Sequence, residues 1–533
     1  MDKFNAEEQA TLARHFSNTD QPVFVLTDLP EMVKGALFAR YSRSPKTLRR
    51  LFLDEFQDGI EAEAKAATVG IGRAADLYER VFIEYGDDSV AQLAGVHVAV
   101  EGASNILTKV IERGRLMSYL EQSTRYMPYN DRPDGRWRYH VPAELTGEAR
   151  TSFVASADRA FELYTKLFEP LQEYLRSQYP QPDGTSGAAY RMSIRAKACD
   201  ILRGLLPAAT TSNVGIYGSA QGYEALLLRL LSHELAEARE LGQAMLAELK
   251  KVVPVFVERV ERQDRGGVFI DYLRRSKDEA RQLLRSLTPA MDNDDLDSSR
   301  VDLTDFEVDG ETKVAAAILF ELAGVSDDDA MAAARKLSPA ERAEIIAAYT
   351  GPRSNRRHRP GRAFERTSYR FEITADYGAF RDLQRHRLLT LEWQLLNPHL
   401  GFDLPPEICA IGAEGEWSGL MRHCRAVYEE LRSATSETVA QYIVPMAYRI
   451  RFVMEMNARE AMHVIELRTT EQAHRNYRVI CMEMHRLIAE HAGHQAIADA
   501  IKFVGESDGG LERLSAEQRI EDKRSALASR PAP

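Results

Sequence analysis

The sequence predicts an α+β protein made of two tandem copies of one helix-rich domain, and three observations support this fold class. Apolar residues recur at helical spacing through most of the 533 residues. Stretches with the alternating pattern of a strand are fewer. A short arginine-rich signature occurs once in each half of the chain, and matching landmarks follow both copies in the same order.

Helices are predicted for three long stretches. Residues 223–251 and 470–491 carry apolar side chains at helical spacing with charges between them, which is typical of amphipathic helices. Residues 451–467 are more apolar, and we predict a buried helix there.

Strand signals are shorter. Residues 367–374 alternate in the manner of a strand, and residues 23–26 and 137–141 are weaker candidates. Residues 292–306 are rich in Asp and Ser, which favours a linker or an exposed loop. We expect residues 511–533 to form a flexible tail.

The two copies of the signature occupy residues 113–122 and 385–394, with two arginines, a leucine, a hydroxyl residue and a glutamine in step. Downstream, Pro207 lies 22 residues before Arg229, and Pro445 lies 23 residues before Arg468. We therefore predict a first domain at 1–290, with an insertion near 131–165, and a second domain at 291–510.

Composition excludes several classes of protein. Lys and Arg number 69 and Asp and Glu number 80, so the net charge of −11 argues against a nucleic-acid-coating protein. The four cysteines form no C-x-x-C pair, so we expect neither a cysteine metal site nor a disulfide scaffold. No signal peptide or apolar run of membrane-spanning length is present, so we expect a cytoplasmic protein without membrane contact.

The first signature continues as RGRLMSYLEQSTRY, in which three arginines, a glutamate and a serine fall close together. Paired arginines can bind phosphate or carboxylate groups, whereas the simpler alternative is a charged helix end with i,i+4 ion pairs.

These residues resemble the flavin-dependent thymidylate synthases, whose signature is RHRxxSxNExSxRY. The first copy matches at Arg113, Arg115, Ser118, Glu121, Ser123, Arg125 and Tyr126, but has Gly114 and Leu120 for the family's His and Asn. The second copy keeps the whole triad as Arg385, His386 and Arg387, and its late segment matches at Val444, Pro445, Arg451, Phe452, Asn457, Ala458, Arg459, Leu467 and Arg468. In the first copy Arg203, Pro207 and Arg229 fit the late segment, with Gly218 at the family's Asn.

Family enzymes are homotetramers with active sites between subunits, so the resemblance implies two complementary residue sets. The first copy keeps the set that holds the dUMP phosphate and sugar: Glu121, Ser123, Arg125 and Arg203. The second copy has Trp393, Leu395, Asn397 and Gln441 at those places, but keeps the flavin and uracil set: Arg385, His386, Arg387, Asn457 and Arg468. We therefore expect a composite site formed by the two halves and a homodimer that reproduces the tetramer of domains.

The resemblance also implies roles. Arg125 and Arg203 bind phosphate with Ser123, and Glu121 orients them. Arg468 is the catalytic residue beside the uracil, and Arg385 contacts substrate and flavin. The remaining flavin candidates are His386, Arg387, Asn457, His463 and His233, the last two of which are as readily structural. No metal is expected.

The implied reaction converts dUMP to dTMP with FAD, with methylenetetrahydrofolate as carbon donor and NADPH as reductant. None of the cysteines lies in a nucleophile motif, which agrees with flavin chemistry. Two alternatives stay open: a flavin enzyme acting on another pyrimidine nucleotide, and a non-catalytic flavin- or nucleotide-binding paralogue. The departures that favour them are Gly114, Arg366 at a family His, and Asp382 at a family Gln. The basic run at 353–362 is a solvated loop, a clamp for FAD or folate, or an RNA contact.

Overall fold

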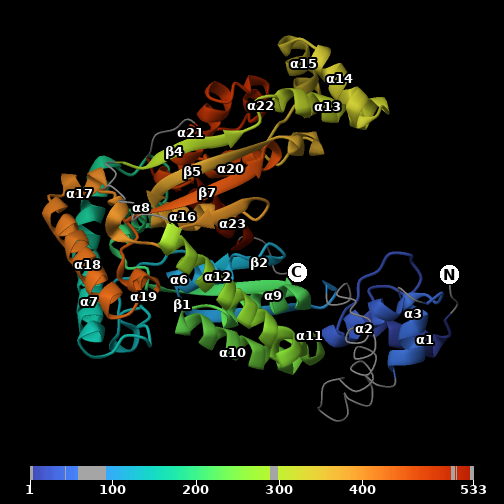
Figure 1. The fold of residues 1–533 in the computed structure, drawn as a ribbon, viewed down its shortest axis with the longest axis horizontal. Coiled ribbons are helices and arrows are strands. Elements are labelled where there is room, and N and C mark those ends of the chain that lie inside the picture. The colour runs from blue at the N-terminus through green and yellow to red at the C-terminus, as the bar shows by residue number, and fades with distance from the viewer. Residues whose placement is uncertain are drawn as a thin grey trace. The chain divides into compact units, whose positions relative to one another are not determined.

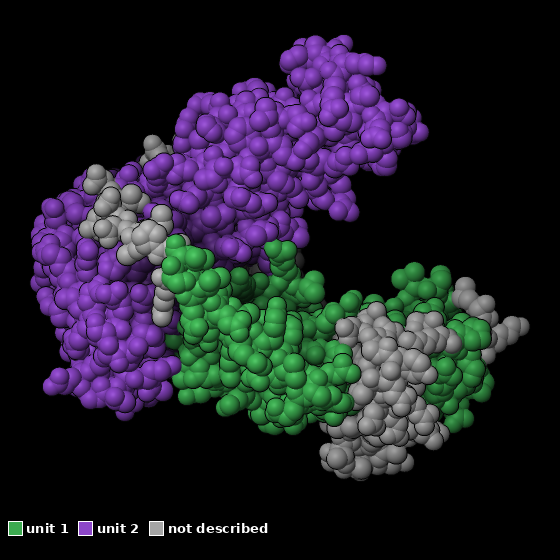
Figure 2. All heavy atoms as spheres, in the orientation of Figure 1, with its two compact units in different colours: residues 1–103, 110–121, 213–291 green, residues 104–109, 122–212, 292–533 purple. Residues whose placement is uncertain are grey.

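A computed structural model describes residues 4–41, 44–57, 92–287, 298–505, 510–511 and 513–528. The chain divides into two compact units, coloured separately in Figure 2. Unit 1 comprises residues 1–103, 110–121 and 213–291, and unit 2 comprises residues 104–109, 122–212 and 292–533. Residues 122–212 of the first sequence copy therefore belong to the same unit as the second copy.

Unit 1 contains a three-stranded sheet in the order β1-β3-β2, with β2 antiparallel to β3. Helix α9 leaves the end of β3 and packs against α10 and α11. The strands and helices are β1 Gly95–Ser104, β2 Met117–Glu121, β3 Thr211–Ser219, α1 Ala6–His15, α2 Glu31–Tyr41, α3 Leu48–Leu51, α9 Ala220–Leu231, α10 Ala236–Val252, α11 Pro254–Glu261 and α12 Val268–Leu287 (Figure 1).

Unit 2 contains a four-stranded antiparallel sheet in the order β4-β5-β7-β6. Its strands are β4 Arg300–Phe306, β5 Ser368–Asp376, β6 Thr390–Trp393 and β7 Arg449–Asn457. The helices are α7 Gly147–Gln178, α8 Gly187–Leu202, α13 Gly310–Ala323, α14 Asp327–Lys336, α15 Pro339–Thr350, α16 Tyr377–Leu383, α17 Pro406–Ala410, α18 Glu414–Ala434, α19 Glu437–Ala440, α20 Ala458–Arg468, α21 Arg475–Glu490, α22 Gln495–Ala500 and α23 Leu514–Ala528, while α6 Asn105–Ile111 follows β1 across the unit boundary.

The two sheets repeat one pattern, which confirms the predicted α+β fold with tandem copies. The order β1-β3-β2 in unit 1 corresponds to β5-β7-β6 in unit 2, where β4 adds an edge strand. Strands β3 and β7 each contain 9 residues and begin at the same distance after Pro207 and Pro445. None of the helices in the described part of the chain is both long and apolar enough to span a membrane.

Within unit 2, the segments around the two matched prolines pair directly with each other. Pro207 and Pro445 form an antiparallel bridge. The backbone N–H of Ala208 donates to Val444 O at 2.9 Å, and that of Met446 donates to Leu206 O at 2.9 Å. These bonds are reciprocal between equivalent positions, as in an isologous interface of a twofold dimer. The two copies therefore meet, at this point, inside one chain.

Several predicted elements need correction. Residues 451–467 are divided between β7 and α20, because Ile450, Phe452, Met454 and Met456 alternate into the core at strand spacing. The helix predicted at 223–251 is two helices, α9 and α10. The chain turns between them, and the His233 Nδ1 accepts the backbone N–H of Leu235 there.

The shorter predictions also differ from the structure. Residues 367–374 do form a strand, β5, whereas 23–26 and 137–141 contribute only isolated bridges, at Leu26 and Tyr139. Residues 300–306 of the predicted linker form β4, since they pair with β5, while 292–297 lie outside the described residues. Within the predicted flexible tail, residues 514–528 form α23, which packs against α8.

Candidate functional site

The site begins with a buried ion pair between Arg125 and Asp200. The Arg125 Nε and Nη2 donate to the two Asp200 carboxylate oxygens at 2.6 and 2.7 Å. Burial by itself raises the pKa of the Asp200 carboxyl, but Arg125 outweighs it and lowers that pKa to about 2. The same carboxylate raises the pKa of Arg125 despite its burial. Helix α8 supplies Asp200, and the turn after β2 supplies Arg125.

The end of α8 also places Arg203 in the site. Its Nη1 lies 3.6 Å from the Asp382 carboxylate, and its Nη2 is buried without a hydrogen-bond partner. Gly378 makes room for this guanidinium, since a Cβ there would stand 3.1 Å from the Arg203 Nε and 2.9 Å from Asp376 Oδ1. An unpartnered buried guanidinium N–H favours a ligand that accepts hydrogen bonds.

Asp382 lies close to arginines from both sequence copies. Arg385 Nη1 lies 3.7 Å from its second oxygen. Burial raises the pKa of the Asp382 carboxyl, but Arg385, Arg203, Arg468 and Arg125 together hold it far below its ordinary value. Asp382 is therefore an ionised buried carboxylate.

Tyr477 of α21 lies between the two copies' arginines. The Arg125 Nη1 donates to its hydroxyl oxygen at 3.0 Å, and the Arg468 guanidinium carbon lies 5.6 Å from its ring centroid. Burial, followed by the Asp382 charge, raises the pKa of this phenol. Tyr477 thus fixes the spacing of one guanidinium from each copy.

Arg513, which directly precedes α23, completes a group that we call the arginine cluster. Its Nη2 lies 3.9 Å from Asp200, and its guanidinium stacks over Tyr126 at 4.2 Å from the ring centroid. The cluster consists of Arg125, Arg203, Arg385, Arg468 and Arg513 with the carboxylates Asp200 and Asp382. All of these residues belong to unit 2.

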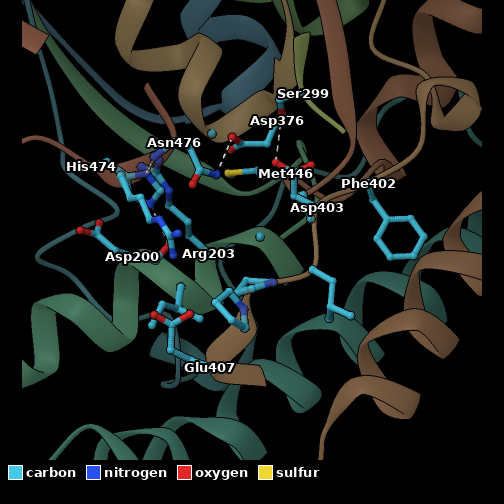
Figure 3. Close-up of a pocket in the computed structure, with 18 of the residues that line it drawn as sticks. Asp200, Arg203, Ser299, Asp376, Phe402, Asp403, Glu407, Met446, His474 and Asn476 are labelled. Carbon is cyan, nitrogen blue, oxygen red and sulfur yellow. Dashed lines mark hydrogen bonds between the residues drawn. The ribbon is translucent and has the colours of Figure 1, made fainter. Parts of the chain in front are cut away.

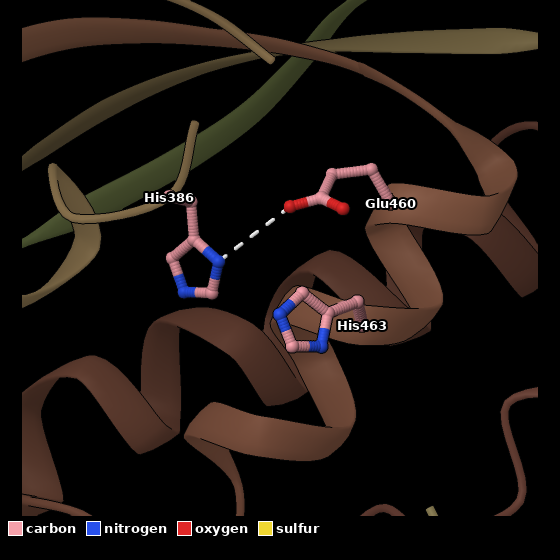
Figure 4. A group of neighbouring side chains, drawn as sticks. All are labelled: His386, Glu460 and His463. Atoms are coloured by element: carbon pink, nitrogen blue, oxygen red, sulfur yellow. Dashed lines mark ion pairs between the residues drawn. The ribbon is translucent and has the colours of Figure 1, made fainter. Parts of the chain in front are cut away.

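His386 of the second triad contacts Arg468 of the cluster, and Figure 4 shows it beside Glu460 and His463. The Arg468 Nε donates to its Nε2 at 2.9 Å, so the imidazole proton lies on Nδ1, which faces Glu460 at 3.6 Å. Burial, followed by Arg468, holds the pKa of His386 well below its ordinary value. Burial raises the pKa of Glu460 to about 7. His386 is therefore neutral and accepts from Arg468.

His386, Glu460 and His463 offer ligand atoms within 4.8 Å of one another, a spacing that a metal ion could use. Their surroundings favour another role. The Arg359 Nη2 lies 2.7 Å from His463 Nδ1, and Arg468 donates to His386, so both imidazole lone pairs face cations. Burial and these arginines lower the pKa of His463 to about 4. This arrangement suits neutral imidazoles that orient arginines better than a divalent cation.

A cavity of about 610 Å³ adjoins the cluster, within the size range of small-molecule sites (Figure 3). Asp200, Arg203 and His474 line it and belong to both features. Asn476 and Asp376 also line it: Asn476 donates to Asp376 at 2.8 Å, and burial, followed by the Asp403 charge, raises the pKa of Asp376 to about 6. The cavity is thus polar on the side that faces the arginines.

Other residues from the sequence prediction have local roles. Ser123 Oγ accepts the backbone N–H of Arg125 at 3.3 Å, which shapes the turn that carries that arginine. Asn457 caps α20 by accepting the N–H of Glu460 at 2.9 Å. Arg387 is exposed beside His386. Glu121 and His233 lie in unit 1, where both are largely removed from solvent.

The positions that the first copy lost are filled. A Cβ at Gly114 would stand 2.6 Å from the Tyr119 hydroxyl and 3.3 Å from Arg229 Nη2, so a histidine there would require these side chains to shift. The structure also corrects one equivalence: Ser219 caps α9 as Asn457 caps α20, so Ser219 and not Gly218 corresponds to that asparagine.

In the second copy, the side chains at the phosphate positions also form local contacts. Gln441 corresponds to Arg203, but its amide donates to Thr438 O and accepts from Leu396 N. Asn397 corresponds to Arg125, and it accepts the N–H of His399 at 2.9 Å. Both side chains now serve the local backbone.

The basic run at 353–362 has mixed surroundings. Arg353 is buried and forms a bidentate pair with Glu466 at 2.6 and 2.5 Å, so this residue is structural. Arg357, Arg359 and Arg362 are exposed, and Arg362 pairs with Glu365. Cys199 is buried in α8, and burial raises the pKa of its thiol to about 12, which fits no nucleophilic role.

Sequence reasoning missed Asp200, His474, Tyr477 and Arg513. Their signals were weak: Asp200 precedes Arg203 by three positions on a helix, and His474 and Tyr477 have the same spacing. Arg513 has no pattern around it that distinguishes it from other arginines.

The fold and the cluster define an α+β protein with an internal repeat and a cluster of arginines around two buried carboxylates. The chain belongs to the thymidylate synthase complementing protein family, whose model matches residues 35–255 and 313–492. A UPF0159 protein of Chlamydia muridarum is 36% identical over 528 residues, covering 97% of this chain and 98% of the relative. One from Thermoplasma acidophilum is 34% identical over 515 residues, covering 91% and 98%. A flavin-dependent thymidylate synthase of Mycobacterium sp. (strain JLS) is 31% identical over 181 residues, covering 33% of this chain and 66% of that enzyme.

Proposed function

We propose that this protein is an FAD-dependent thymidylate synthase-like enzyme that converts dUMP to dTMP, with methylenetetrahydrofolate as carbon donor and NADPH as reductant. The observation that carries the proposal is the convergence of arginines from both sequence copies on Asp382. Arg125 and Arg203 come from the copy with the phosphate set, and Arg385 and Arg468 come from the copy with the flavin and uracil set. One working site per chain then needs residues from both halves.

In this proposal the phosphate of dUMP binds to the guanidiniums of Arg125 and Arg203, with Ser123 supporting them. The buried, unpartnered Nη2 of Arg203 supplies a donor that is ready for an anionic oxygen. Asp200 holds the Arg125 fork in one orientation, so less side-chain entropy is lost when the phosphate binds.

Arg468 lies beside the uracil in this proposal, where it stabilises the negative charge that develops on the ring. The neutral His386 accepts one of its N–H groups and leaves the others for substrate. Asp382 keeps its neighbouring guanidiniums apart from one another and neutralises part of their charge. These groups bind and orient the substrate without a protein nucleophile.

The residues also fit a flavin nucleotide, which carries two phosphates. Arg385 and Arg387, the two exposed arginines that flank His386 in the triad, offer guanidiniums to a pyrophosphate. Arg359 is exposed beside His463. Together with His386, Asn457 and His463, they would hold FAD. When bound, the flavin supplies the hydride chemistry that the side chains lack.

One observation favours a second candidate, a flavin enzyme that acts on another pyrimidine nucleotide. Asp382 stands where the resemblance leads to a glutamine, and an ionised carboxylate only accepts hydrogen bonds. A ring with an exocyclic amino group, as in a cytosine nucleotide, would satisfy it better than the uracil oxygens would. Turnover of dUMP and dCMP by the same preparation distinguishes the two substrates.

Complementation of a thymidine-requiring strain tests the proposal. Growth without thymidine is expected for the wild-type chain and not for R468A, and the purified protein should be yellow. A soluble, yellow protein that neither complements nor forms dTMP in vitro would refute thymidylate synthesis and favour a flavin-binding paralogue. We further propose a cytoplasmic homodimer, which sedimentation analysis of the purified protein tests.

A further inference from the structure

We propose that the C-terminal segment completes the anion site, with Arg513 binding the phosphate group of the nucleotide beside Arg125 and Arg203. The inference rests on the proposed nucleotide substrate and adds a residue from outside both family-matched segments. Such a residue cannot be carried over from the family signature, and the structure alone points to it.

The first argument is the environment of the Arg513 side chain. Its exposed fraction is only 7%, and its buried Nη1 has no hydrogen-bond partner among the described residues. The nearest carboxylate in the ion pairs of the described residues is Asp200 at 3.9 Å, which already accepts two short hydrogen bonds from Arg125. A buried guanidinium with an unused N–H is costly unless an acceptor arrives. A ligand oxygen would supply that acceptor.

The second argument is the charge of the arginine cluster. Five guanidiniums face the two ionised carboxylates Asp200 and Asp382, and Asp376 near Arg203 is the next carboxylate. Positive charge therefore remains in excess even when all three carboxylates are ionised. A phosphate monoester carries a charge of about −2 at neutral pH and balances this excess.

The third argument is that Arg513 is held in place from both sides. Its guanidinium stacks on Tyr126, in the same turn that carries Arg125. Behind it, α23 packs on α8, where the backbone N–H of Ser186 donates to Gln518 at 3.0 Å and the Ser186 hydroxyl bonds to Glu521. Helix α8 is also the helix that presents Asp200, so one scaffold supports both sides of the site.

Isothermal titration of the full-length protein tests the proposal with three probes: dUMP, deoxyuridine and inorganic phosphate. We expect R513A to weaken binding of dUMP and phosphate about 10- to 100-fold, the range for losing one charge-assisted hydrogen bond. Binding of deoxyuridine should not change, because it lacks the phosphate. The matched control is R519A, which removes an exposed arginine of α23, six positions further along the chain, and should bind all probes like the wild type.

Several outcomes would overturn the proposal. If R513A binds dUMP with wild-type affinity, or loses affinity equally for dUMP and deoxyuridine, Arg513 has only a packing role. Absence of phosphate binding by the wild type would also refute the proposal. If R513A does not fold, R513K decides, since it keeps the charge but loses the fork, and unchanged phosphate affinity contradicts the proposal. Phosphate binding that depends on Arg513 without any dTMP formation would refute only the proposed reaction.

Discussion

The sharpest prediction concerns whether the site forms within one chain or between two. Arg125 and Arg468 come from different sequence copies, yet both contact Tyr477 of the same chain. The perturbation is a pair of single variants, R125A and R468A, co-expressed with different tags so that mixed dimers form. We predict that the mixture recovers no activity.

The expected magnitudes differ enough to decide the matter. R468A removes a donor from developing charge, and such losses reduce turnover about 100- to 1,000-fold. R125A removes a charge-assisted hydrogen bond and should weaken dUMP binding at least about tenfold. If sites formed between chains, each mixed dimer would keep one intact site of two, so purified mixed dimers would show about half of wild-type activity. Within one chain, the mixture stays near the mean of its parents.

The assay is dTMP formation by tandem-affinity-purified mixed dimers at subsaturating dUMP. Co-purification of two differently tagged wild-type chains controls for dimer exchange, and R125K replaces R125A if loss of the Asp200 partner prevents folding. Recovery of about half of wild-type activity would refute the single-chain site. Full activity of R125A or R468A would show that the substituted arginine is not part of the active site.

Three further predictions concern stability. The Asp200 pKa of about 2 lies below its ordinary 3.8, so the ionised carboxylate stabilises the folded state by about 2 kcal/mol above pH 3.8, and this stabilisation is lost as the pH falls through 2. D200N should therefore unfold at a lower urea concentration than the wild type at pH 7. An equal difference between the two proteins at pH 2 would contradict this prediction. The Glu460 pKa of about 7 lies above its ordinary 4.5, so the contribution of the protonated carboxyl to folding stability is fully present below pH 4.5 and falls by about 3 kcal/mol as the pH rises through 7. E460Q should flatten this pH dependence in urea titrations. G114A should lower stability by about 1–3 kcal/mol in thermal melts, because its Cβ meets the Tyr119 hydroxyl. G215A should not lower it, because its Cβ would have its nearest neighbour at 3.8 Å. Equal effects of the two substitutions would refute the crowding at Gly114.

Much of the fold could be predicted because the duplication leaves matched local signals. Pro207 and Pro445 correctly marked equivalent positions of the two copies, and the alternation at 367–374 correctly marked β5. Residues 451–467 were mistaken for one helix because apolar residues dominate both β7 and α20, so composition masked the change of period. The linker and tail predictions failed at β4 and α23 because polar composition says little about segments that pair or pack with distant partners.

By itself, the sequence determined that the chain repeats one family domain, and it predicted two complementary residue sets, because residue types at fixed spacing can be read without a fold. Only the tertiary structure decided how they meet. Arg125 and Tyr477 are separated by 352 positions and touch because the two proline segments pair inside one chain. It also decided which carboxylates neutralise the arginines and that Arg513 joins them. Ion pairs are set by distance in space and by burial, and neither is encoded in local sequence.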